Sequence, residues 1–137
     1  MTSSTPTNVP PNADEANEAN EANEANEAND SDFVLLAGGL AELATQNPVR
    51  DGSVSPHRTY SGEHVRIRHL AFDAGVVLAE HSAPRPVVII VVEGEVLFTV
   101  GTDTHRLSAG AVLHLDQGIS HSVTAVETSR LVLTLVV

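Results

Sequence analysis

The stretch Leu78–Val96 reads "LAEHSAPRPVVIIVVEGEV" and contains the longest apolar run of the chain, the six residues from Val87 to Val92. The run is rich in β-branched residues and is far too short to span a bilayer, so it predicts a β-strand. Because it is apolar on both faces, we expect the strand to be covered on both sides. One side would face an interior, and the other a helix, a second sheet or a second subunit.

Short segments of strand character lie on either side of this run and are separated by turn residues. They are "EHVRIRHLAF", "GVVLAEH", "AVLHLDQGISHSVTAV" and "SRLVLTLVV", with "GTDTHRLSAG" supplying a hairpin turn. About six or seven short strands with no helix among them predict an all-β domain, a small antiparallel sandwich or barrel. We assign residues 49–137 to this barrel.

The chain before the barrel divides into two parts. Residues 1–32 are predicted to be a disordered, acidic, low-complexity tail, because the repeated "EAN" triplets drift around a helix and never align their alanines into a stripe. Residues 33–48 are predicted to form a helix that covers the barrel. Ser31 or Asp32 can cap it, Asn47 and Pro48 end it, and its apolar face consists of Leu36, Leu40 and Leu43.

The charge of the chain is concentrated in the tail. Eight of the 18 acidic residues lie between Asp14 and Asp32 with no basic residue, so this region carries −8 of the net −11, and ten acids against seven arginines leave −3 elsewhere. There is no lysine and no basic cluster, which disfavours nucleic acid as a partner. The absence of cysteine excludes disulfides and thiolate metal sites. The N-terminus has no signal-peptide pattern, so we expect a cytoplasmic protein that does not enter a membrane.

Glycines and histidines recur at particular intervals within residues 62–137. They are Gly75, His81, Gly94, Gly110, Gly118 and His121. This spacing resembles the two motifs of the cupin superfamily, G-x5-H-x-H-x3,4-E-x6-G and G-x5-P-x-G-x2-H. The resemblance implies a small β-barrel of the jelly-roll type, and it covers more than half of the chain.

The departures from the cupin motifs bear on function. In metal-binding cupins the ligands are the two histidines and the glutamate of the first motif and the histidine of the second. At these four positions the present chain has His81, Ala83, Val87 and His121, and Asp116 replaces the proline of the second motif. The resemblance therefore implies a cupin that lacks two of the four usual ligands.

The remaining histidines and carboxylates define a candidate site. A catalytic metal usually has at least three protein ligands, so His81 and His121 would need a third, for which Asp116 is the best carboxylate and His114 an alternative. His69 is a further possibility, whereas His57, His64 and His105 are expected to be exposed. Without a metal, the same histidines would form the polar end of a pocket. The predicted pocket residues are His81, His121, His114, Val87, Ile89 and Val91.

Three functions stay open on these grounds. The leading hypothesis is a cupin that binds a small, partly apolar molecule in the barrel, without a tightly held metal and with little or no catalysis. The alternative is a metal-dependent dioxygenase or isomerase with iron, manganese, nickel or zinc as its cofactor. The third is a structural module whose interior is filled by side chains. We expect a homodimer, because the central strand and the C-terminal "LVLTLVV" expose more apolar surface than one helix can cover.

Overall fold

The computed structural model describes residues 32–137. One short helix, α2 (Leu40–Gln46), precedes nine strands in this part of the chain. The strands are β1 (Val54–Ser61), β2 (Val65–Phe72), β3 (Val77–His81), β4 (Val87–Glu93), β5 (Glu95–Val100), β6 (Asp103–Ser108), β7 (Val112–Leu115), β8 (His121–Ala125) and β9 (Ser129–Val136).

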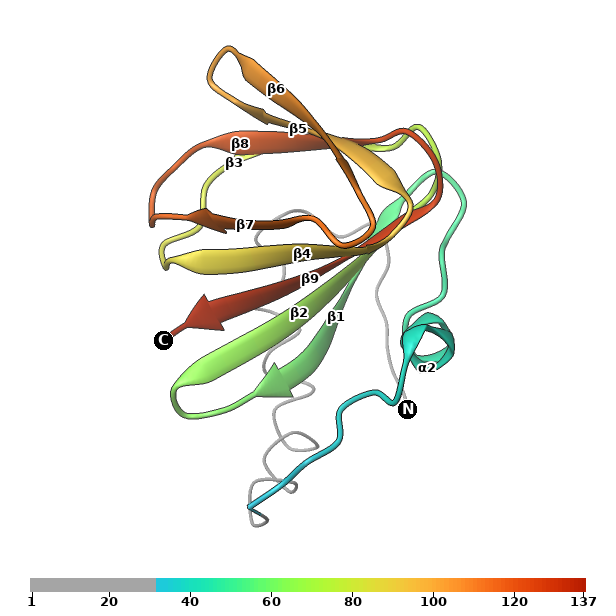
Figure 1. The fold of residues 1–137 in the computed structure, drawn as a ribbon, viewed down its shortest axis with the longest axis vertical. Coiled ribbons are helices and arrows are strands. Elements are labelled where there is room, and N and C mark those ends of the chain that lie inside the picture. The colour runs from blue at the N-terminus through green and yellow to red at the C-terminus, as the bar shows by residue number, and fades with distance from the viewer. Residues whose placement is uncertain (1–31) are drawn as a thin grey trace.

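The strands form two antiparallel sheets that face one another. One sheet has the order β1-β2-β9-β4-β7 and the other the order β3-β8-β5-β6, so the chain passes repeatedly from one sheet to the other (Figure 1). This is the jelly-roll arrangement, and the predicted all-β fold is confirmed. The nine strands exceed the six or seven predicted. The prediction missed β1, whose sequence "VSPHRTYS" contains a proline and lacks a clear apolar alternation.

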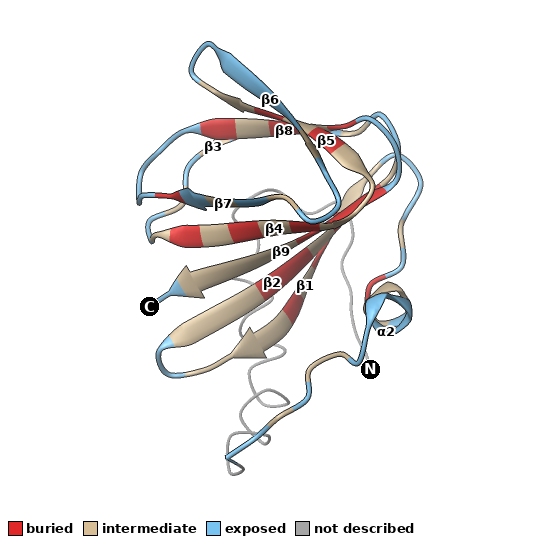
Figure 2. Cartoon of the chain, in the orientation of Figure 1, coloured by how far each residue is buried: buried red, intermediate tan, exposed pale blue. Residues whose placement is uncertain are grey.

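The interior between the sheets is built by alternation along the strands. Along β4, Val87, Ile89 and Val91 are only 3%, 2% and 1% exposed, while the residues between them are half-buried (Figure 2). The alternate residues point to the other side of the sheet, because successive side chains of a strand leave on opposite faces. The expectation that both faces of this strand are covered therefore holds fully only for the inner face.

The helix is shorter than predicted. It begins at Leu40 rather than at residue 33, after Gly38 and Gly39, which favour helix weakly. The Glu42 carboxylate, in the first turn of the helix, accepts a hydrogen bond from the Gly38 N–H at 2.8 Å. This contact stabilises the N-terminal end of the helix. Leu36 lies outside α2, and none of the helix residues is buried. Asn47, immediately after the helix, is only 5% exposed and donates hydrogen bonds to the carbonyl oxygens of Ser55 and His69 in the sheet.

Apart from Asp32, the predicted tail lies outside the described residues, and its disorder stays a prediction. Within residues 32–137, no helix is both long enough and apolar enough to cross a membrane. The cytoplasmic location stays a prediction as well.

Candidate functional site

Two of the predicted site residues come together at one end of the barrel. His81 ends β3 and His121 begins β8, and the two residues are directly opposite in the register of these antiparallel strands. Their ring centroids lie 4.4 Å apart with an angle of 53° between the planes. The ring of Phe98 stacks on His121, with centroids 5.3 Å apart and planes 11° from parallel. The ring of His121 is therefore held by contacts with two other rings.

The same kind of backbone contact orients both imidazoles. His81 donates from Nδ1 to the carbonyl oxygen of Ala79 at 2.8 Å, and His121 donates from Nδ1 to the carbonyl oxygen of Ile119 at 2.9 Å. In a neutral ring with its proton on Nδ1, the Nε2 atom carries a lone pair and accepts hydrogen bonds. Burial is the main cause that lowers the pKa of His121 below its usual 6.5, which keeps this ring neutral at neutral pH. The pair thus presents two acceptor atoms.

The three predicted wall residues lie on the inner face of β4. Val87 is the first residue of β4 and directly follows the β3–β4 loop. It pairs with Leu115 of β7 and Leu135 of β9. All three valine and isoleucine side chains belong to the hydrophobic core and are 1–3% exposed. Their burial shows that they fill the interior. Of the three, Val87 has the sequence position of a metal ligand in the cupin motif, and there it supplies only hydrocarbon.

The structure does not bring His114 to this pair. His114 lies opposite Val88 in the pairing of β7 with β4, whereas the inward residues Val87 and Leu115 form the next pair. Alternation therefore turns His114 outward, where it is exposed, and the prediction that it lines the interior is wrong. His69 is likewise excluded, because it lies on the outer face of β2.

Asp116, the proposed third ligand, is exposed just after β7. Its loop is joined to the β3–β4 loop by a hydrogen bond from the Gly118 N–H to the carbonyl oxygen of Ala83, at 2.8 Å. Among residues 32–137, however, no three His, Asp or Glu side chains cluster in a way that could hold a metal ion. The donor set at the His81–His121 pair is thus two imidazoles, which does not fit the three protein ligands of a resident catalytic metal.

The cupin domain family model matches residues 68–137, a segment that includes both histidines and extends from β2 to the end of the chain. The chain belongs to the cupin domain family. No curated protein matches this chain.

Solved structures similar to this cupin agree with the fold. A conserved protein of unknown function from Streptococcus pyogenes is 21% identical over 77% of this chain and 88% of its own, with a TM-score of 0.62. A cupin superfamily protein from Desulfitobacterium hafniense is 16% identical over 78% of this chain and 93% of its own, with a TM-score of 0.64. An RmlC-like cupin from Desulfovibrio desulfuricans is 28% identical over 64% and 85%, with a TM-score of 0.59.

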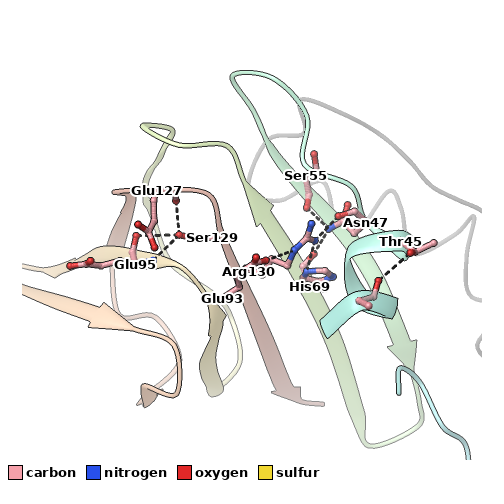
Figure 3. A network of polar contacts seen from close by, with 10 residues as sticks. Thr45, Asn47, Ser55, His69, Glu93, Glu95, Glu127, Ser129 and Arg130 are labelled. Atoms are coloured by element: carbon pink, nitrogen blue, oxygen red, sulfur yellow. Dashed lines mark hydrogen bonds and ion pairs between the residues drawn. The ribbon is translucent and has the colours of Figure 1, made fainter. Parts of the chain in front are cut away.

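A buried polar network occupies the outer face of the larger sheet (Figure 3). Arg130 of β9 donates from Nε to the Glu93 carboxylate at 2.9 Å and from one terminal nitrogen to the carbonyl oxygen of Asn47 at 2.7 Å. The same terminal nitrogen lies 3.3 Å from His69 Nε2. Asn47 in turn donates to the carbonyl oxygens of Ser55 and His69. The network therefore fastens the segment after α2 to the sheet of the cupin.

Sequence reasoning did not find this network, because its members are far apart along the chain and only tertiary pairing joins them. His69 is fully buried, and His57, which pairs with it across β1 and β2, is half-buried rather than exposed as predicted. The pKa of His69 is lowered to about 3, mainly by burial and further by the charges of Arg130 and His57. Nε2 of His69 accepts from Arg130, so the ring is neutral in the folded protein.

We expect the free energy of unfolding to fall as the pH drops below 6.5. The unfolded chain then protonates His69 with its ordinary pKa of 6.5, while the folded chain does not until about pH 3. In that window the unfolded state binds the extra proton, and each such histidine removes up to about 1.4 kcal/mol per pH unit. Urea unfolding of the wild type and of His69→Gln, which keeps an acceptor near Arg130, measures the contribution. An equal pH slope in the two proteins would contradict it.

Proposed function

We propose that this cupin binds a small molecule at the His81–His121 end of the barrel, without a tightly held metal, and that it has little or no catalytic activity. The observation that carries the proposal is the donor set of the site. Both histidines donate Nδ1–H to backbone and leave Nε2 as an acceptor, and no third ligating side chain clusters with them in residues 32–137. Two fixed acceptors beside apolar side chains suit a ligand that has hydrogen-bond donors at one end and hydrocarbon at the other.

The chemistry of this site favours a neutral ligand group such as a hydroxyl or an amide N–H. An ionised imidazole would lose the acceptor at Nε2, and burial opposes that charge at His121. The stacked Phe98 ring fixes the plane of His121 and therefore the direction of its lone pair. Val87 adds an apolar contact where metal-binding members of the superfamily have a glutamate.

The metal-dependent alternative is an outcome of the test. Histidines that bind metals also donate their second ring nitrogen to carbonyl groups, so the orientation of the two rings by itself does not separate the two functions. The number of donors supports binding without a metal, because a tightly held catalytic metal usually has a third protein ligand in addition to two histidines such as His81 and His121.

The test combines metal analysis with ligand binding on the full chain purified without a His-tag. We expect iron, manganese, nickel and zinc to be well below one per chain. We expect members of a panel of small hydroxyl-bearing and amide-bearing compounds to raise the melting temperature in proportion to the logarithm of their concentration. His121→Ala should abolish these shifts. His114→Ala, which removes an outward histidine, should leave them unchanged.

Two results would contradict the proposal. A stoichiometric metal that survives purification, and that is lost in His121→Ala, would establish the metal-dependent alternative. A folded protein whose melting temperature no compound changes would favour a structural module.

We also propose the predicted homodimer, which is supported by exposed apolar side chains at several places on the barrel. They include Val77, Val112, Val126 and Val136, with exposed fractions of 41–65%.

A further inference from the structure

A cavity lies away from the His81–His121 pair, on the outer face of the larger sheet. Its volume is about 510 Å³, within the range of small-molecule sites. The hairpin that joins β1 to β2 forms one side, and the extended segment of residues 32–36 forms the other. Neither the cupin motifs nor the function proposed above makes use of this cavity.

The floor of the cavity is apolar because of the alternation along β2. Val65 and Ile67 line it, while Arg66 and Arg68 lie at the intervening positions and leave the sheet on the other face. The interior of the barrel is also on that other face, since Leu70 and Phe72 pack there. The sheet therefore separates this cavity both from the arginines and from the barrel interior.

The N-terminal segment closes the cavity by the same alternation. Val34 and Leu36 line it, whereas their neighbours Phe33 and Leu35 are 77% and 66% exposed. Only every second side chain of this stretch thus takes part. The segment contributes hydrocarbon from one face and leaves the other face to solvent.

The polar side chains that line the cavity are two carboxylates, the Tyr60 ring and the imidazole of His64, which lies 3.8 Å from the Glu63 carboxylate. Asp32 and Glu63 line it at its two sides, and the Glu63 side chain is 87% exposed. No arginine is among the described residues that line it. The ring of Tyr60 also lines the cavity and packs on Gly62, where a Cβ atom would lie 2.8 Å from the ring carbon Cζ. Aromatic faces and carboxylates both attract cations.

We propose that this cavity binds a small organic cation with an apolar body. The hydrocarbon part would lie on Val65, Ile67, Val34 and Leu36, and the charged group would lie between Tyr60 and the two carboxylates. The negative charges of Asp32 and Glu63 would repel an anion. A neutral apolar molecule would gain nothing from the attraction of these carboxylates for a positive charge. The inference is independent of the function proposed for the barrel.

The experiment is an NMR titration of ¹⁵N-labelled full-length protein with three benzyl compounds at a pH above the ordinary pKa of histidine. Benzyltrimethylammonium is the cation, benzyl alcohol the neutral analogue and benzoate the anion. We expect saturable shifts for the amides of Tyr60, Val65 and Ile67 with the cation, clearly weaker binding of the alcohol and none of benzoate. Added salt should weaken the binding of the cation, because the carboxylates are exposed.

Two pairs of variants separate the contributions of charge and shape. Asp32→Asn with Glu63→Gln should weaken binding of the cation by about fivefold, since exposed charge pairs are weak. Asp51→Asn with Asp103→Asn, which removes two acids elsewhere on the surface, should leave it unchanged. Val34→Trp should abolish binding by filling the cavity. Leu35→Trp places the same ring on the exposed side and should not.

Several outcomes would overturn the inference. They are equal affinity for the cation and the alcohol, the absence of saturable shifts at millimolar concentrations, and shifts centred on His81 and His121. The charge variants test the inference even if Val34→Trp perturbs folding, because their substitutions lie at the rim. His121→Ala should not change binding of benzyltrimethylammonium, so failure here is distinguishable from failure of the proposed barrel function.

Discussion

Replacement of Gly94 by alanine is expected to destabilise this cupin by about 3 kcal/mol or more. Gly94 lies between β4 and β5 with a φ of +85°, a region that disfavours any residue with a Cβ by about 1–2 kcal/mol. The added Cβ would also collide with the carbonyl oxygen of Thr128 and with Ser129 Oγ, and would lie 2.7 Å from Ser129 Cα. Backbone atoms cannot move aside as a flexible side chain can, so overpacking adds a further penalty of about 1–3 kcal/mol.

The close approach at Gly94 has a structural reason. Ser129 Oγ accepts a hydrogen bond from the Glu95 N–H at 3.1 Å. Its hydroxyl can donate to the carbonyl oxygen of Glu127 at 2.6 Å or to that of Glu95 at 3.1 Å. These contacts join the start of β5 in one sheet to the start of β9 in the other. A side chain at position 94 would force this junction apart.

Gly75→Ala is the matched control for Gly94→Ala. Gly75 has nearly the same φ, +83°, but a Cβ there would meet no atom within 4 Å. We therefore expect it to lose only the conformational part, about 1–2 kcal/mol. Urea unfolding of both variants measures the difference that is due to the close approach. Equal losses would show that the contact with Ser129 contributes nothing.

Arg130→Met is expected to lower the free energy of unfolding by about 2–3 kcal/mol. Arg130 is only 5% exposed, and its removal leaves the carbonyl oxygen of Asn47 and Nε2 of His69 buried without their donor. Unpaired buried acceptors are expensive, and loss of one partner of a buried ion pair is typically worth about 3–5 kcal/mol. The expected value is smaller here because the Glu93 side chain is 40% exposed and solvent compensates its charge in part.

Arg106→Met provides the comparison. Arg106 also pairs with a glutamate, Glu95, but its side chain is 63% exposed. Such a pair is worth about 0.2–1 kcal/mol, so Arg106→Met should change the free energy of unfolding little. A similar loss in the two variants would mean that the burial of Arg130 does not matter. Increased hydrogen exchange in residues 40–47 of Arg130→Met alone would confirm that the network fastens this segment.

The architecture was largely predictable from sequence. The apolar run of β4 and the spaced glycines pointed to an all-β cupin barrel, and the same spacing selected His81 and His121, which are adjacent in the structure. Strand β1 was not predicted, because its stability comes from pairing with β2 rather than from its own pattern. The helix was predicted too long, because leucine spacing suggested a stripe that the two glycines interrupt.

The candidate site was predictable only in part. The sequence shows which residues have imidazole or carboxylate groups. It also shows that Ala83 and Val87 replace two of the expected ligands. The direction of each side chain is not, because it depends on strand register, and one step of alternation separates an inward Leu115 from an outward His114. For the same reason only the structure could join Asn47, His69 and Arg130 into one network.

Sequence by itself therefore determined the all-β class from its periodic pattern. Its resemblance to the cupin motifs added the family, the jelly-roll fold and the pair of histidines, because motif spacing is a local property of the chain. Tertiary structure decided which candidates face the same space. It placed the rings of His81 and His121 beside one another and turned His114 outward. It also left Asp116 exposed and formed a cavity on the outer face of the larger sheet. Such outcomes depend on the register between strands that are distant along the chain, and the register is set by the packing of the whole barrel.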